Sequence, residues 1–297
     1  MARAGIQSNF AKAVVLILTA IFLFDIMGAI IKHLGDRYPP QQLSVFRNLF
    51  GLVPSVLVLW YSKAWHEAGR PLVIERWLLA LGRGLFVTGA QFCFYLALTK
   101  MAFATASTLV FAGPLFVTAL SVPLLGKPVG IVRWLAVLAG FAGVLLVMQP
   151  GGEVFNWYAI LPVFAAFGYA CNNITAQLFR QETTTAAINL YSIVGALAGS
   201  AVLLWLTTDF VPVVGIVDWL WLLALGTAGG MAVFCLISAY RLTEPSSLSP
   251  FEYFGIPFSF LIGWIVFSEA PFDQLFPGVL LIVGGGLAVI WRERRRL

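Results

Sequence analysis

The sequence predicts an all-α membrane protein with ten transmembrane helices, arranged as two inverted five-helix repeats. Three observations support this fold class: an apolar composition, long apolar runs and an internal repeat. Of the 297 residues, 60% are hydrophobic and 10% are charged, and the mean hydropathy is +0.92. A soluble domain usually has about 25% charged residues to cover its surface. We therefore expect the chain to lie in a lipid bilayer.

The apolar runs, separated by Pro, Gly and charged clusters, define the expected helices. A spanning helix needs roughly 20 apolar residues. Every backbone polar group in hydrocarbon must be satisfied, and the runs lack the two-residue alternation of barrel strands, so helices are expected throughout. The expected helices cover residues 13–31, 43–61, 77–98, 103–125, 131–148, 155–178, 188–206, 219–239, 248–267 and 275–291.

The basic residues between these helices are distributed unequally. With ten helices, only three basic residues lie on the side opposite the N-terminus: Lys32, Arg37 and Lys100. Thirteen lie on the side of the N-terminus: Arg3, Lys12, Lys63, Arg70, Arg76, Lys127, Arg133, Arg180, Arg241, Arg292, Arg294, Arg295 and Arg296. The positive-inside rule then predicts a multi-pass protein of the cell (inner) membrane with both termini in the cytoplasm.

An internal repeat divides the chain into two halves. A shift of 143 residues aligns residues 103–116 with residues 246–259, and it places Pro114 on Pro257. We therefore expect a first five-helix repeat over residues 1–150 and a second over 151–297. Because five is an odd number, the second repeat must be inverted relative to the first. Inverted repeats are typical of secondary transporters, whose substrate sites lie near the bilayer midplane.

Three segments, residues 94–128, 140–151 and 239–271, resemble the repeat of EamA-type carriers in the drug/metabolite transporter superfamily. Lys32 and Arg47 fit the same pattern. Among these carriers the chain is most similar to the bacterial YddG-type amino-acid exporters, which implies efflux of aromatic and other neutral amino acids by alternating access. A carrier of drugs or other metabolites is the alternative within this family.

The sequence departs from this family after the fourth expected helix, where a Gly-Glu pair is common and Gly126 and Lys127 stand instead. A polytopic membrane enzyme is the alternative outside the family. No H-E-x-x-H or G-x-S-x-G motif is present to support that alternative. We expect no catalytic residues, metal or cofactor, and the expected partners are an amino-acid substrate and the lipid bilayer, without nucleic acid. The oligomeric state stays open.

Four ionisable residues fall inside the expected helices, where a charge is costly unless it is paired or faces water: Asp25, Arg47, Arg83 and Glu252. Asp25 and Arg47 differ in depth by only about 3 Å, so we expect an ion pair, with a role in gating or proton coupling as the alternative. Arg83 and Glu252 could pair likewise or flank an inner gate. Two such pairs would use all four charges, which favours facilitated diffusion over proton coupling.

The expected substrate site lies near the bilayer midplane. Pro114 and Pro257 should kink the fourth and ninth helices there, act as hinges and place these two helices on opposite walls of a cavity. The amides of Asn172 and Asn173 should bind the polar head of an amino acid. Aromatic rings should form the apolar walls: Tyr95, Phe111, Tyr253 and Phe254.

Overall fold

The computed structural model describes residues 2–69, 72–126, 131–149, 156–180, 183–242, 248 and 251–294, and every regular element in these residues is helical. The longer helices are α1 (Ala2–Leu34), α2 (Pro40–Trp60), α4 (Trp77–Lys100), α5 (Phe103–Val110), α6 (Gly113–Leu125), α7 (Ile131–Met148), α8 (Ile160–Thr175), α9 (Thr185–Thr207), α10 (Ile216–Leu242), α12 (Gly255–Phe267) and α14 (Gly278–Arg294). The short elements are α3 (Lys63–Glu67), η1 (Trp157–Ala159), η2 (Ala176–Leu178) and α13 (Phe272–Leu275).

The all-α membrane class is confirmed, whereas the count of ten spanning helices stays a prediction. Within the described residues, seven helical stretches are long and apolar enough to cross a membrane. Two of these stretches combine several elements: α5 with α6, and η1 with α8 and η2. Two more apolar helices are shorter, namely Trp134–Met148 of α7 and the 13-residue α12.

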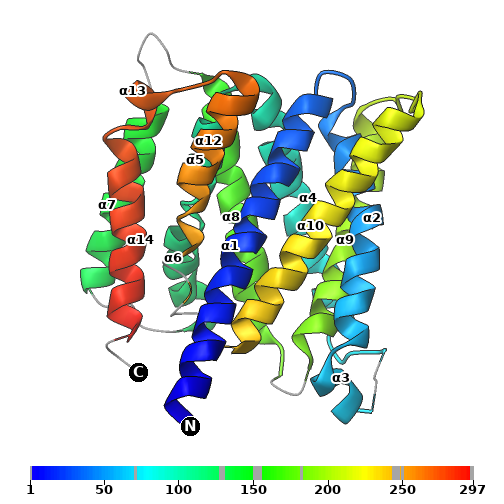
Figure 1. Cartoon of the computed structure of the whole chain (residues 1–297), viewed down its shortest axis with the longest axis vertical. Coiled ribbons are helices and arrows are strands. Elements are labelled where there is room, and N and C mark those ends of the chain that lie inside the picture. The colour runs from blue at the N-terminus through cyan, green and yellow to red at the C-terminus, as the bar shows by residue number, and fades with distance from the viewer. Residues whose placement is uncertain are drawn as a thin grey trace.

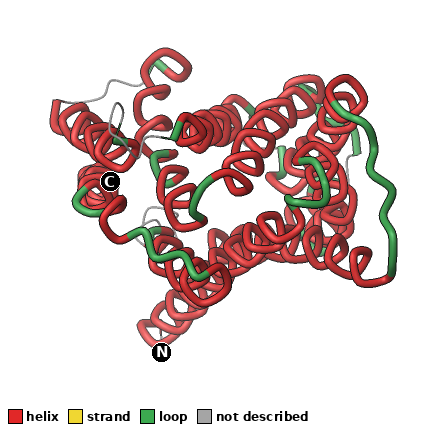
Figure 2. The backbone as a smooth tube through the Cα atoms, turned by 90° about the horizontal axis from the view of Figure 1, so that it is seen from above, coloured by secondary structure: helices red, strands yellow, loops and turns green. Residues whose placement is uncertain are grey.

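The long helices form one bundle, in which α1 begins and α14 ends at the same end (Figure 1). We call this the terminal end, and we call the other end, where α1 ends at Leu34 and α2 begins at Pro40, the opposite end. Figure 2 looks down the bundle and shows α7 and α14 as a pair at one edge, where they pack against each other.

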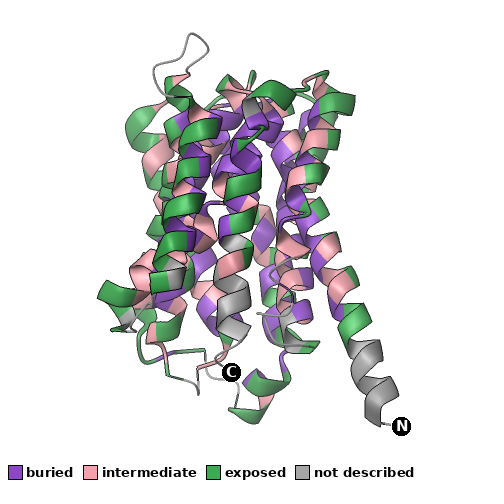
Figure 3. Cartoon of the chain, turned by 90° about the vertical axis from the view of Figure 1, so that its left-hand side faces the viewer, coloured by how far each residue is buried: buried purple, intermediate pink, exposed green. Residues whose placement is uncertain are grey.

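The outer surface of the bundle is apolar, and exposed residues cover the outer faces of the helices (Figure 3). Exposed Trp side chains lie near both ends. Trp60, Trp77 and Trp134 are near the terminal end, and Trp157 and Trp205 are near the opposite end. Trp is enriched at the two interfaces of a membrane, so the surface fits a chain that spans the bilayer.

Glycines allow several helices to approach closely. α4 packs against α9, and a Cβ built at Gly195 would overlap the backbone of Leu81. α2 packs against α10, where a Cβ at Gly226 would overlap Phe50. Gly195 and Gly226 each begin a GxxxG spacing, which is typical of closely packed helices in membranes.

Apolar packing differs between the two ends. At the opposite end one core cluster joins α1, α2, α4, α5 and α10, and it includes Met27, Phe46, Tyr95, Phe103 and Leu225. Near the terminal end two separate clusters occur instead. One joins α2, α3, α4 and α9, and the other joins α1, α10 and Leu248. A further separate cluster, which includes Ala104, Leu115, Val147 and Ile282, joins α5, α6, α7 and α14, so neither end is packed as one continuous core.

Candidate functional site

Two helix breaks lie side by side in the middle of the bundle. α5 ends at Val110 and α6 begins at Gly113, while a turn at Tyr253 and Phe254 precedes α12. Each break lies just before Pro114 or Pro257. A proline has no N–H for the carbonyl four residues earlier, and its ring clashes with that carbonyl. The predicted interruptions are present, two to four residues before each proline; their action as hinges stays a prediction.

The two broken helices contact each other. α5 packs against α12, and a Cβ built at Gly255 would overlap the ring of Phe111. The rings of Phe111 and Tyr253 lie with their centroids 6.0 Å apart. The expectation that these helices stand on opposite walls of a cavity is therefore wrong, because a glycine in α12 leaves room for direct packing.

Several buried polar atoms have no hydrogen-bond partner in the described part of the chain. They include the Tyr95 and Tyr253 hydroxyls, Thr108 Oγ1, Asn172 Oδ1 and Asp25 Oδ2. A buried polar group without a partner costs roughly 1–3 kcal/mol. Such a group in a native structure calls for a partner, such as water or a ligand. The chain thus presents a set of unfilled polar positions in its interior.

Asp25 lies on the side of α1 that faces the two broken helices. A Cβ at Gly28, one turn toward the opposite end, would lie 3.0 Å from the ring of Phe103. One turn toward the terminal end, Ile21 and Phe111 both border Gly255. Asp25 lies between these two contacts, beside the parts of α5 and α12 that contain the buried hydroxyls of Thr108 and Ser259.

The expected ion pair between Asp25 and Arg47 is wrong, since the described residues form no such contact. Arg47 approaches α1 near Met27, because both border Gly229 of α10. Met27 lies about 200° around the helix from Asp25. The two charges match in depth, but α1 itself stands between them.

Arg47 lies in a polar cluster of α2, α4 and α9. Its Nη1 donates to Asn48 Oδ1 at 3.0 Å, and its Nε has no partner among the described residues. Asn48 Nδ2 donates to Gln91 Oε1 at 2.9 Å, and Gln91 Nε2 donates back to Asn48 Oδ1 at 3.2 Å. Tyr95 of α4 and Tyr169 of α8 lie within electrostatic range of Arg47.

Arg83 bonds to α8 and α9 and not to Glu252, so of the two alternatives only the flanking of an inner gate stays a prediction. Its Nε and Nη2 donate to the carbonyl of Asn172, at 3.1 and 2.8 Å, and its Nη1 donates to Ser192 Oγ at 3.1 Å. Asn172 lies in the last turn of α8, where unpaired carbonyls attract a cation. Without these two ion pairs, the argument for facilitated diffusion loses its basis.

The structure brings together only part of the predicted substrate site. Tyr95 is fully buried, Tyr253 is buried, and Phe111 contacts Tyr253. In contrast, Asn173 is exposed, and Phe254 is 46% exposed. Sequence position gives the depth of each residue, but the face of the helix depends on packing.

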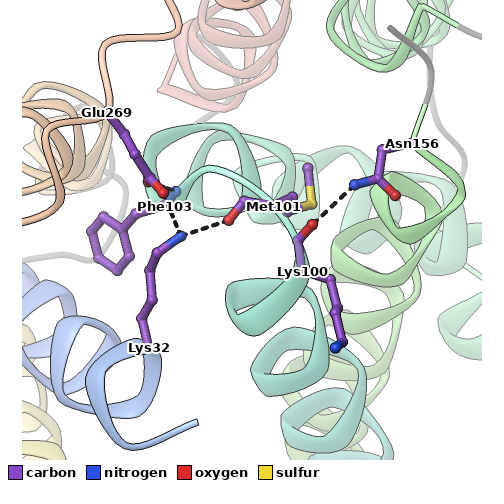
Figure 4. A network of polar contacts seen from close by, with 6 residues as sticks. All are labelled: Lys32, Lys100, Met101, Phe103, Asn156 and Glu269. Atoms are coloured by element: carbon purple, nitrogen blue, oxygen red, sulfur yellow. Dashed lines mark hydrogen bonds and ion pairs between the residues drawn. The ribbon is translucent and has the colours of Figure 1, made fainter. Parts of the chain in front are cut away.

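A polar network at the opposite end was missed by the sequence argument (Figure 4). Lys32 Nζ lies 2.8 Å from Glu269 Oε1 and donates to the carbonyl of Met101 at 2.8 Å, and Glu269 Oε2 accepts from Phe103 N at 2.8 Å. Glu269 borders a cavity of about 330 Å³. The available signal was the repeat: a shift of 142 residues places Glu269 on Lys127, where the family pattern has Glu.

A second contact at the opposite end joins the loop after α1 to α10. Arg37 Nη1 pairs with Asp218 Oδ1, and the Tyr38 hydroxyl donates to Asp218 Oδ2 at 2.6 Å. Burial and this hydrogen bond raise the pKa of the Tyr38 hydroxyl. Tyr38 therefore stays a donor to Asp218 across the neutral pH range.

The chain is similar in sequence to known transporters. Residues 11–149 match the EamA-like transporter family. The chain is 27% identical to an S-adenosylmethionine uptake transporter of Rickettsia bellii, over 92% of this chain and 90% of that protein. It is 32% identical to a riboflavin transporter of Rhizobium johnstonii, over 64% of this chain and 63% of that protein.

Two further matches extend over almost the whole chain. A pseudopaline exporter of Pseudomonas aeruginosa is 25% identical, over 94% of this chain and 95% of that protein. One solved crystal structure covers 96% of this chain and 99% of its own, with a TM-score of 0.63 and 23% identity. The last match shows a shared fold.

Proposed function

We propose that this chain exports aromatic and other neutral amino acids across the cell (inner) membrane by alternating access. Its similarity to the EamA-like family and to several small-molecule carriers makes it a multi-pass secondary transporter of small metabolites, and not an enzyme. The observation behind the finer proposal is the set of buried, unpartnered polar atoms, one of which belongs to Tyr253 beside the Phe111 ring at the helix breaks.

The chemistry of this region fits the parts of an amino acid. An amino acid has an ammonium group, a carboxylate and a side chain that is apolar in the aromatic and aliphatic cases. The unpartnered Asn172 Oδ1 can accept from the ammonium group, and the Tyr95 hydroxyl can donate to the carboxylate. The Tyr253 ring can form part of the apolar wall. The Phe111 ring offers an apolar surface. Asn173 and Phe254 complete the proposed set from the neighbouring exposed positions.

The packing pattern supports two inverted repeats, residues 1–150 and 151–297. The two repeats can be compared by exchanging α1 with α8, α2 with α9, α4 with α10 and α7 with α14. After this exchange, each main pair of packed helices corresponds to an observed pair. The pair α1–α10 becomes α8–α4, and α2–α10 becomes α9–α4; the pairs α2–α9 and α7–α14 become themselves. A two-fold axis in the membrane plane would produce this correspondence, and it suits the rocking of one repeat against the other.

The contacts that join the helices at the two ends of the bundle indicate which side of the membrane is closed. If the basic terminal end lies in the cytoplasm, the opposite end faces outward, where an apolar cluster of α1, α2, α4, α5 and α10 and the Lys32–Glu269 pair join the helices. The structure then represents a state closed toward the outside. The breaks before Pro114 and Pro257 are the proposed hinges for the change to the other state.

Efflux of labelled phenylalanine and alanine from proteoliposomes tests this proposal. We expect the parent to transport both, Asn172→Ala to slow both, and Phe111→Ala to slow phenylalanine more than alanine. Asn173→Ala is the neighbouring comparison, one position along α8. If all three variants transport both solutes as well as the parent, the proposed site is wrong. If the parent transports neither, the amino-acid substrate is wrong.

A second candidate function is transport of S-adenosylmethionine. The similarity to the S-adenosylmethionine uptake transporter of Rickettsia bellii supports it. This molecule combines an amino-acid head with a flat purine ring, so the same polar atoms and aromatic rings suit it. Adding labelled S-adenosylmethionine and riboflavin to the same vesicles separates the two candidates. Transport of S-adenosylmethionine without transport of phenylalanine or alanine would favour the second.

A further inference from the structure

Arg47 has an uncompensated positive charge in the interior of the bundle. Its side chain is 9% exposed, and it forms no ion pair with any described carboxylate. A buried guanidinium without an anion is costly, because the low-dielectric interior replaces its hydration only through hydrogen bonds or a counter-charge. An anion that enters the bundle would therefore bind Arg47 favourably.

One edge of the guanidinium is hydrogen-bonded, and the other edge contains the unpartnered Nε. Asn48 accepts from Nη1, and the Asn48–Gln91 bonds hold this amide in place. The opposite edge, formed by Nε and Nη2, faces Gly229 of α10. Nε has no partner. The edge that remains is the side of arginine that offers two parallel N–H groups to a carboxylate.

Gly229 of α10 packs closely beside this edge, where a larger residue would press on the guanidinium. A Cβ built at Gly229 would lie 3.1 Å from Nε and 3.5 Å from Nη2 of Arg47. The same space is bordered by Met27 Sδ, at 2.8 Å from that Cβ. A methionine side chain is unbranched and flexible, so it can move aside for a ligand.

Tyr95 adds a second unfilled donor. It is fully buried, its hydroxyl has no partner, and it lies within electrostatic range of Arg47. Tyr169 of α8 is half-buried in the same neighbourhood. Two unpartnered donors, one of them charged, define a position for an anion, and the neighbouring rings suit a flat or apolar substituent.

We propose that the Nε and Nη2 edge of Arg47, together with the Tyr95 hydroxyl, binds the carboxylate of the transported substrate. This proposal rests on the proposed function and assigns the anion-binding part of its site. Arg83 offers the contrast, because the C-terminal turn of α8 and Ser192 occupy its donors. Arg47, in contrast, keeps its Nε as an unused donor for a ligand.

Binding of matched ligand pairs to the purified full chain tests the proposal. Each pair differs only in the carboxylate: phenylalanine with phenethylamine, and S-adenosylmethionine with its decarboxylated form. We expect the parent to prefer the carboxylate member of at least one pair by about tenfold or more, as for a hydrogen-bonded charged group. Arg47→Gln should remove this preference, Arg47→Lys should retain part of it, and Tyr95→Phe should reduce it.

Control variants separate binding from folding. Arg83→Gln removes another buried guanidinium, and it should lower thermal stability without changing the preference within a pair. Gly229→Ala should weaken binding of the carboxylate member, whereas Gly89→Ala, where an added Cβ meets nothing within 4 Å, should not. A fully retained preference in a folded Arg47→Gln protein would overturn the proposal, as would a parent that binds neither carboxylate member.

The two proposals can fail separately. Binding of S-adenosylmethionine but not phenylalanine, with a preference lost in Arg47→Gln, would contradict amino-acid export and support the role of Arg47. If the parent transports phenylalanine, and Arg47→Gln keeps the parent's preference for the carboxylate ligand, the function is supported and the role of Arg47 is overturned.

Discussion

Lys32 of α1 and Glu269, which follows α12, form an ion pair of 2.8 Å at the opposite end of the bundle. The pair also bonds to the backbone of Met101 and Phe103, where α4 gives way to α5. It therefore ties three parts of the bundle together at the end that we assign to the outside. If this end opens during transport, these contacts must break.

Glu269→Gln should loosen this end. The side chain of Lys32 is only 14% exposed and would lose its carboxylate. We expect a loss of roughly 1–2 kcal/mol in the free energy of unfolding, less than for a fully buried pair. The matched control is Glu75→Gln, because the Glu75–Arg180 pair is more than half exposed and should contribute less than about 1 kcal/mol. Equal effects of the two variants on thermal unfolding in detergent would contradict this role.

Gly195→Val should prevent the close approach of α4 and α9. An added Cβ would meet the backbone of Leu81, and a backbone cannot move aside as a flexible side chain can. We expect a loss of about 3 kcal/mol or more, as for strong overpacking. Gly82→Val is the control, since nothing lies within 4 Å of a Cβ there. Unfolding temperatures that match between the two variants would show that this packing is dispensable.

Pro257→Ala and Pro114→Ala should slow transport without lowering thermal stability. Alanine restores the missing N–H and favours a continuous helix. We expect unchanged or higher thermal stability together with slower transport, because the proposed hinges stiffen. Pro123→Ala, inside α6 away from the break, is the control. Transport at the parental rate in both hinge variants would contradict the hinge role.

Asp25→Asn should remove any dependence of transport on a proton gradient. The carboxyl group is buried beside the broken helices and forms no ion pair within the described residues, so it is available to exchange a proton. Flux measured with and without an imposed pH gradient checks this. A gradient dependence that survives in Asp25→Asn would exclude Asp25 as the coupling group, and its absence in the parent would indicate facilitated diffusion.

The sequence predicted where helices form better than it predicted which side chains contact each other. Composition and apolar runs determine that helices form, and the proline positions located both breaks. The pairing of charged residues was mispredicted because it depends on helix rotation. Asp25 and Arg47 agree in depth, yet they lie on different sides of α1.

The opposite end shows a second limit of sequence reasoning. Lys32 and Glu269 are 237 residues apart, and only the folded bundle brings α1 beside the segment after α12. The same holds for Arg83, whose partners are carbonyl and hydroxyl groups of α8 and α9. Backbone carbonyls leave no signal in a search for opposite charges.

Substrate counterflow in proteoliposomes tests the central claim, alternating-access transport of amino acids, most directly. Vesicles containing the chain are loaded with unlabelled phenylalanine and diluted into a trace of labelled phenylalanine. A carrier that exposes one site to each side in turn will accumulate label transiently above its external concentration, and we predict this overshoot. Label that only equilibrates, or that does not enter beyond the level of protein-free vesicles, would contradict the account.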